Sequence, residues 1–203
     1  MIMSKPRISV CVPTHDMENG AFFLSRLEAS LARQSFKDYE LVITNKGSMP
    51  VNSNSAIKKA KGDIIKMLYM DDYFYSENAL QRVAEAFDNG AKWAVSGCVH
   101  DNGRIHNPHY PKYDYRIYEG QNTIGSPSVL AFLNDDPLLF DEEMSWMLDI
   151  DLYVRLKERY GEPHIINFPD IVIGIGEHQM TNKLSPEQKK AEEDIFFYRT
   201  HLV

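Results

Sequence analysis

Apolar runs of strand length alternate with segments of helical periodicity through residues 1–100. The expected strands lie at 8–12, 41–44, 64–68 and 91–99, and the expected helices between them lie at 22–34, at 51–61 with Gly62 as a cap, and from an N-cap at Ser76 to Asn89-Gly90. Strands that are apolar throughout and separated by helices are typical of a mostly parallel sheet covered on both faces. The sequence therefore predicts a Rossmann-like α/β fold.

The second half of the chain has a looser pattern. Residues 100–121 read as a long loop with a short strand, and further strands are expected at 126–133 and 165–175. Helices are expected at 146–160 and after Ser185, because Ser185-Pro186-Glu187-Gln188 is a capping box with proline at the first helical position. A length of 203 residues suits a single domain, 1–203.

Composition limits the classes of function. The formal net charge of −7 argues against a dominant nucleic-acid-binding surface, which needs clustered Lys and Arg. Cys11 and Cys98 lie far apart within apolar runs and are expected to be buried free thiols, as suits a reducing compartment. No signal peptide and no run of about 20 apolar residues is found, so a cytoplasmic protein is expected.

Two adjacent carboxylates, Asp71 and Asp72, follow the apolar run at 64–68. Like charges at the rim of a buried sheet repel one another and lose hydration, so a hard divalent cation such as Mg²⁺ or Mn²⁺ would stabilise them. The alternative is a solvated turn, since Asp is a common turn residue. In favour of a site, Asp16 and Asn45 fall at the ends of neighbouring strands, and ligands of parallel sheets bind at that edge.

The order of these features resembles the family 2 glycosyltransferases of the GT-A fold over nearly the whole chain. The matching pieces are the first strand with its Pro13-Thr14-His15-Asp16 turn, the helix up to Gln34 with the strand after it, and the Lys58-Lys59-Ala60-Lys61-Gly62-Asp63 segment before the carboxylates. The resemblance implies a nucleotide-sugar-binding half at 1–100. The other half, 101–203, would hold a small mixed acceptor-side sheet and a C-terminal helix.

The resemblance also assigns the first half of the site. Asp72 would bind the divalent metal in a DXD-like motif, and Asp71 would contact the ribose or the metal shell. The turn residues Pro13, Thr14 and Asp16, together with Asn45, would bind the nucleotide sugar. This chain departs from the family at two places, where Tyr69 replaces an Asp of the metal motif and Asn45 replaces the Asp that helps to read the base.

Trp146 to Leu156 resembles the family's Glu-Asp-x-Asp-Leu-x-x-Arg-Leu helix, with Leu148 in place of the Glu. On that match Asp149 is the catalytic base. Residues two apart on a helix project roughly 200° apart, so Asp149 and Asp151 cannot face one site, and the second is expected to pair or cap. Both could instead be helix N-terminal carboxylates favoured by the dipole.

Two further positions follow from the resemblance. His178, after the last expected strand, falls where many family members carry a metal-binding histidine, although a lone His is more often a surface residue. Ser126 lies in a small-residue strand where backbone and hydroxyl groups can approach the sugar, and the alternative is a plain edge strand.

The function implied is transfer of a sugar from a nucleoside diphosphate sugar, expected to be a UDP-sugar, to a hydroxyl acceptor with inversion. Mn²⁺ or Mg²⁺ would be the cofactor. The acceptor class remains open among glycan, lipid-linked glycan, protein and modified nucleic acid, and so does oligomeric state. One alternative is a degenerate, non-catalytic sugar-nucleotide-binding module. A sugar nucleotidylyltransferase is a weaker alternative, because the turn after the first strand is not the Gly-rich basic loop of those enzymes.

Overall fold

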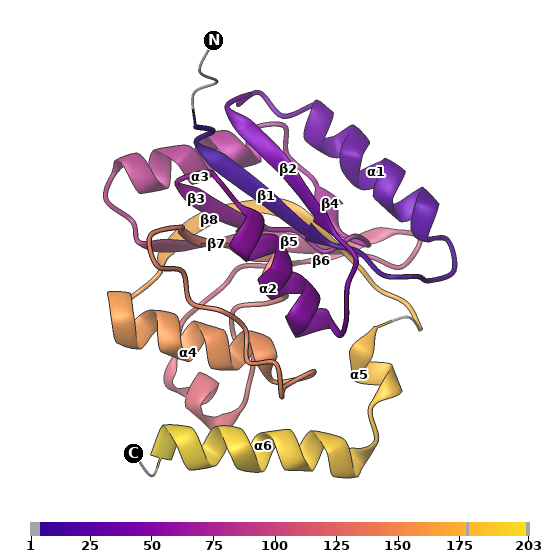
Figure 1. Ribbon diagram of the computed structural model, residues 1–203, viewed down its shortest axis with the longest axis vertical. Helices are drawn as coiled ribbons and strands as arrows, with labels where there is room; N and C mark the ends of the chain where they lie inside the picture. The colour runs from indigo at the N-terminus through magenta and orange to yellow at the C-terminus, as the bar shows by residue number, and fades with distance from the viewer. Residues whose placement is uncertain (1–4, 178, 202–203) are drawn as a thin grey trace.

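A computed structural model describes residues 5–177 and 179–201, in which helices surround one twisted sheet (Figure 1). The strands are β1 (Ile8–Pro13), β2 (Tyr39–Thr44), β3 (Ile64–Met67), β4 (Tyr73–Phe74), β5 (Trp93–Asp101), β6 (Ile105–His109), β7 (Leu130–Leu133) and β8 (His164–Gly174). The helices are α1 (Gly20–Ala32), α2 (Met49–Lys59), α3 (Ala79–Asp88), α4 (Leu148–Tyr160), α5 (Met180–Lys183) and α6 (Pro186–His201), with short 3₁₀ turns η1 (Tyr115–Glu119) and η2 (Pro127–Val129). The predicted α/β fold is confirmed.

The strand order is β2-β1-β3-β7-β5-β8-β4, and β6 pairs with β5. The three longest ladders, β1–β2, β1–β3 and β5–β8, are parallel, whereas the pairings of β4, β6 and β7 are antiparallel. The second half of the chain thus adds the expected mixed pairing, but its strands continue the first sheet. Because β7 lies between β3 and β5, the two halves of the sequence share one sheet.

The central strands are buried on both faces, as their continuous apolar sequences predict. Ile8, Val10, Cys11 and Val12 of β1 are all fully buried, and Cys98 of β5 is buried too. Both cysteines are free thiols, as expected. Helix α2 packs against β1 and β2, and α3 packs against β5 and β8.

Two predicted helix ends are wrong. Gly62 does not cap α2, which ends at Lys59; glycine is needed there because a Cβ at Gly62 would lie 2.6 Å from the backbone nitrogen of Ser9 in β1. Ser76 is not the N-cap of α3, which begins after Asn78; the Ser76 hydroxyl accepts the N–H of Asn78 at 3.2 Å and so shapes the preceding turn.

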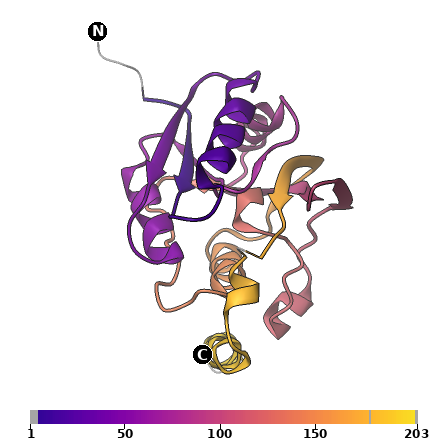
Figure 2. The same cartoon turned by 90° about the vertical axis from the view of Figure 1, so that its right-hand side faces the viewer.

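Helix α6 begins where the capping box predicts. The N–H of Ser185 donates to Oε1 of Gln188 at 2.9 Å, and the N–H of Gln188 donates to Oγ of Ser185 at 3.3 Å. In both views α4 lies between the sheet and α6, at the end of the molecule away from the N-terminus (Figures 1 and 2). No helix in the described part of the chain is long and apolar enough to cross a membrane.

Candidate functional site

A cleft of about 390 Å³ opens at the carboxyl edge of β1 and β3. Four of the residues predicted from the sequence line it: Pro13, Asp71, Asp72 and Ser126. Helix α2, the end of β8 and helix α5 supply the other walls, with Met49, Asn52, Gly174, Met180, Thr181 and Lys183 among the lining residues. Parallel strands thus bring the two carboxylates to the edge where ligands of such sheets bind.

The two carboxylates have different surroundings. Asp72 is 2% exposed, and its Oδ1 accepts the N–H of Gly174 in β8 at 2.8 Å. Burial, and then the charge of Asp71, raise the pKa of Asp72 well above its usual value. Asp71 is half-buried, and its backbone carbonyl accepts from Nη2 of Arg26 at 2.8 Å. A cation bound here would relieve the repulsion that raises the Asp72 pKa.

Gly174 lets β8 approach this turn. A Cβ at Gly174 would lie 2.6 Å from the backbone oxygen of Asp71, closer than side-chain atoms pack, so any other residue would push the turn away. The short strand β4, which was not predicted, follows the carboxylates and pairs with β8, with Tyr73 opposite Val172. The carboxylate turn is therefore held between α1 and β8.

The residues present fit a hard divalent cation. Mg²⁺ is commonly held by one or two carboxylates together with phosphate oxygens of a substrate, and Asp71 and Asp72 provide the two carboxylates in the wall of the cleft. Within residues 5–177 and 179–201 there is no group of three or more His, Cys, Asp and Glu side chains with metal-binding spacing. His178, which the resemblance assigns as a metal ligand together with Asp72, lies outside the described residues.

Tyr69 stands where the resemblance expected a further carboxylate. Its side chain lines the cleft, its hydroxyl lies 3.5 Å from Oγ of Ser53, and its N–H donates to Oγ of Ser128 at 2.8 Å. Burial raises the pKa of Tyr69, with the charges of the nearby carboxylates adding to the effect, so the phenol stays neutral. At this position the cleft is therefore lined by a neutral aromatic ring, where the resemblance expected a negative charge.

Asp149 lies in the first turn of α4 and faces a smaller hollow of about 130 Å³. This hollow adjoins the cleft, since Tyr69 and Ser126 line both. The carboxylate of Asp149 accepts from Nδ2 of Asn122 at 2.7 Å and from the N–H of Ile150 at 2.8 Å. Burial raises the pKa of Asp149 to about 7, which suits a general base.

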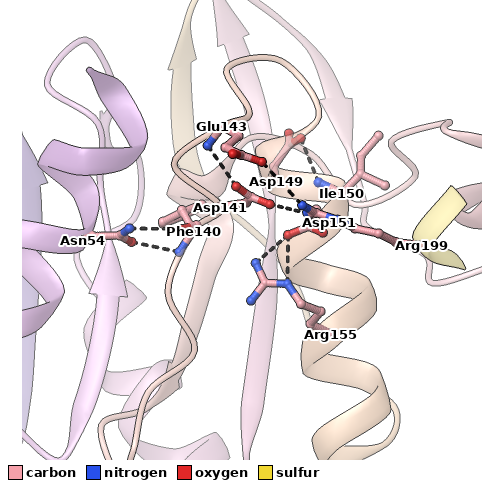
Figure 3. A network of polar contacts seen from close by, with 9 residues as sticks. All are labelled: Asn54, Phe140, Asp141, Glu143, Asp149, Ile150, Asp151, Arg155 and Arg199. Atoms are coloured by element: carbon pink, nitrogen blue, oxygen red, sulfur yellow. Dashed lines mark hydrogen bonds and ion pairs between the residues drawn. The ribbon is translucent and has the colours of Figure 1, made fainter. Parts of the chain in front are cut away.

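Asp151 points to the other side of α4, as the helical spacing predicts. Figure 3 shows it paired with Arg155 and Arg199, while Asp149 bonds to Ile150. Nε of Arg155 donates to Oδ2 of Asp151 at 2.8 Å. Asp151 lines a separate hollow and is absent from the walls of the two that hold Asp149, Asp71 and Asp72.

The other predicted binding residues do not line the cleft. Thr14 is buried, and its hydroxyl donates to the carbonyl of Thr44 at 3.1 Å. Asp16 and Asn45 are exposed on the loops after β1 and β2. Asn52, which sequence reasoning missed, lines the cleft and holds both loops: it donates to the carbonyl of Thr14 at 2.7 Å and accepts the N–H of Lys46 at 3.1 Å.

Glu192 of α6 is a second residue that sequence reasoning missed. Its carboxylate accepts three backbone N–H groups just before α4, from Ser145 at 2.8 Å, Trp146 at 2.7 Å and Met147 at 2.9 Å. These N–H groups belong to the turn that leads into α4, so Glu192 fixes the turn from which the helix begins. The sequence gives one indication of this role. Glu192 lies four residues before Phe196 and so shares its helix face, which is the buried face of α6.

We expect Glu192→Ala to lower the free energy of unfolding by about 2–4 kcal/mol, because one buried and two partly buried N–H groups lose a charged acceptor. Chemical denaturation measures the change. Glu193→Ala is the matched control, since Glu193 lies next in α6 and its nearest cation is Lys190 at 3.9 Å. Equal stabilities of the two variants would contradict the role given to Glu192.

Comparisons with known proteins agree with this geometry. The chain is 25% identical over 236 residues to the "Putative colanic acid biosynthesis glycosyl transferase WcaA" of Escherichia coli (strain K12), with 98% of this chain and 82% of that protein covered. No protein-family model matches the chain.

Solved structures of similar fold include two glycosyltransferases. S. aureus TarS in complex with UDP superposes with a TM-score of 0.66 at 16% identity, covering 96% of this chain and 70% of that one. Mannosyltransferase PcManGT from Pyrobaculum calidifontis, in complex with GDP-Man and Mn²⁺, has a TM-score of 0.58 at 13% identity, covering 99% and 71%. The chain thus has the GT-A type of fold, and the resemblance to glycosyltransferases predicted from its sequence is confirmed.

Proposed function

We propose that the protein transfers a sugar from a nucleoside diphosphate sugar to a hydroxyl group of an acceptor, with inversion at the anomeric carbon. The observation that carries the proposal is that two hollows adjoin: Asp71 and Asp72 line the larger cleft, and Asp149 lines the smaller hollow. A donor held at the first would present its sugar toward the second. The similarity to glycosyltransferases supports the same reaction.

We place the donor diphosphate in the cleft, beside Asp71 and Asp72. These two residues, with His178 as the ligand expected from the sequence, would hold Mn²⁺ or Mg²⁺. When bound, the ion neutralises charge that develops on the departing diphosphate. A UDP-sugar is the favoured donor, since TarS binds UDP and UDP-GlcNAc, although PcManGT binds GDP-Man with Mn²⁺.

Asp149 is proposed as the general base. Its carboxylate takes the proton of the acceptor hydroxyl while the acceptor oxygen forms a bond to the anomeric carbon. The bond from that carbon to the diphosphate oxygen breaks, and its electron pair leaves with the nucleoside diphosphate. Asn122 orients the base, because its Nδ2 donates to the Asp149 carboxylate at 2.7 Å and to the carbonyl of Gly125 at 3.0 Å.

A non-catalytic sugar-nucleotide-binding module is the second candidate, and the neutral Tyr69 in the metal motif favours it. Incubation with a panel of UDP-sugars and Mn²⁺ separates the two. A transferase releases UDP slowly by hydrolysis even without acceptor, and chelation of the metal stops the release. Nucleotide binding with no release from any sugar would favour the binding module.

We expect the rate at saturating substrate to rise with pH, with a midpoint near 7, because Asp149 must lose its proton to act as base. The groups around its carboxylate are Asn122, Glu192, Tyr69 and Tyr153, and among them the Glu192 charge raises the Asp149 pKa.

Glu192→Gln removes that charge and keeps an acceptor oxygen, so the midpoint should move to lower pH. Glu193→Gln is the control and should leave it unchanged. A rate independent of pH between about 5 and 8 would contradict Asp149 as the titrating base. An unmoved midpoint in Glu192→Gln would contradict the electrostatic link between the two carboxylates.

A further inference from the structure

The indole ring of Trp146 forms part of the hollow beside Asp149 and has no role in the sugar transfer proposed above. Trp146 lines this hollow of about 130 Å³ and does not line the larger cleft. At this volume the hollow has room for one small group but not for a length of polymer. The hollow adjoins the cleft, and six residues line both: Met49, Tyr69, Ser126, Ser145, Met180 and Thr181.

Helix α6 holds Trp146 in place from two directions. The backbone N–H of Trp146 donates to Oε2 of Glu192 at 2.7 Å, and Nζ of Lys189 lies 5.6 Å from the centre of the indole ring. The same Nζ donates to the carbonyl of Thr181 at 2.7 Å, which ties α5 to α6. A half-buried aromatic ring fixed at backbone and ring is a preorganised binding wall.

We propose that this hollow binds one sugar ring of the acceptor, so that the acceptor is a carbohydrate; this inference rests on the proposed sugar transfer. An indole face suits the apolar C–H face of a pyranose, while the ring's hydroxyls need polar partners at its edge. Ser126, Ser145 and Thr181 supply hydroxyl groups around the hollow, and Asp149 supplies a carboxylate.

The alternatives fit these walls less well. A nucleic-acid acceptor would need a basic surface, whereas the one charged side chain among the described residues that line this hollow is acidic. An extended peptide would need a groove with unpaired backbone groups, and the N–H groups of Ser145, Trp146 and Met147 already donate to Glu192. A small hollow with an aromatic wall, hydroxyl groups and a carboxylate favours a sugar.

The test is direct binding of methyl pyranosides, measured by ligand-observed NMR with and without UDP and Mn²⁺. Methyl glucoside, galactoside, mannoside and fucoside are compared with glycerol and N-acetylserinamide. We expect saturable binding of at least one pyranoside and none of the two small hydroxyl compounds. Binding of N-acetylserinamide but of no pyranoside, or of no compound at all, would overturn the proposal.

Trp146→Leu should weaken pyranoside binding by about tenfold, which is about 1.4 kcal/mol, because the stacking contact is lost. Its affinity for UDP with Mn²⁺ should stay unchanged, because Trp146 does not line the larger cleft. Phe22→Leu, a change of an aromatic side chain that is 62% exposed on α1, is the control. Equal pyranoside binding by Trp146→Leu and the wild type would overturn the subsite.

The two arms separate this inference from the sugar transfer itself. The difference in pyranoside binding between the wild type and Trp146→Leu reports on the small hollow, because Trp146 lines this hollow and not the larger cleft. If the wild type does not bind UDP in the presence of Mn²⁺, the proposed donor site is wrong, irrespective of the result with pyranosides.

Discussion

Asp149→Asn is expected to lower the rate of sugar transfer by about 10²–10⁴-fold while leaving the affinity for the nucleotide sugar and Mn²⁺ nearly unchanged. The amide cannot accept the acceptor proton as a base, yet it has the size of the carboxylate and can keep the N–H of Ile150 as a donor to its oxygen. Transfer is measured by product formation, and donor binding by calorimetry.

Asp151→Asn is the matched control for this change. Asp151 lies two residues along α4 but pairs with Arg155 and Arg199 on the opposite side, so its loss should change stability more than the rate of transfer. Comparable transfer by Asp149→Asn and the wild type would remove Asp149 from the role of base. A larger loss in Asp151→Asn than in Asp149→Asn would assign the two carboxylates the other way round.

Asp72→Asn is expected to weaken nucleotide binding in Mn²⁺ by about a hundredfold, since metal contacts to phosphate are worth several kcal/mol. The fold should survive, because the amide oxygen can still accept the N–H of Gly174. Burial raises the Asp72 pKa, so the ionised form is disfavoured in the folded protein. Without metal, Asp72→Asn should therefore unfold at the same temperature as the wild type or at a higher one.

Calorimetric titration of UDP, with and without Mn²⁺, measures the first effect, and thermal unfolding measures the second. Asp135→Asn, which changes an exposed carboxylate in the turn after β7, is the control. Unchanged affinity in Mn²⁺ would remove Asp72 from the metal site and leave Asp71, which is the more exposed of the two, as the candidate ligand.

Local rules were enough to predict much of this fold. The apolar run at 8–12 and the one at 64–68 became neighbouring parallel strands of the sheet, and the capping box at Ser185 starts α6. The separation of Asp149 and Asp151 also follows from helix geometry alone. In each case the determinant lies within a few residues of the element.

Contacts between segments that are distant in the sequence could not be predicted from these local rules. Gly62 was taken for a helix cap, but its role is to let β1 approach, which depends on a strand more than fifty residues earlier. The two-residue strand β4 exists only because β8 arrives beside it. Glu192, 43 residues after Asp149, holds the start of α4 through backbone groups, which leave no pattern in sequence. The exposed positions of Asp16 and Asn45 likewise depend on how whole loops are placed.

The anomeric configuration of the product tests the central proposal most directly. The wild type is incubated with a UDP-sugar, Mn²⁺ and a pyranoside acceptor, and the product is examined by NMR. We predict a glycoside whose anomeric configuration is opposite to that of the donor, formed only when the metal is present and lost in Asp149→Asn. A product that keeps the donor's configuration, or bound nucleotide with neither transfer nor hydrolysis, would contradict this account.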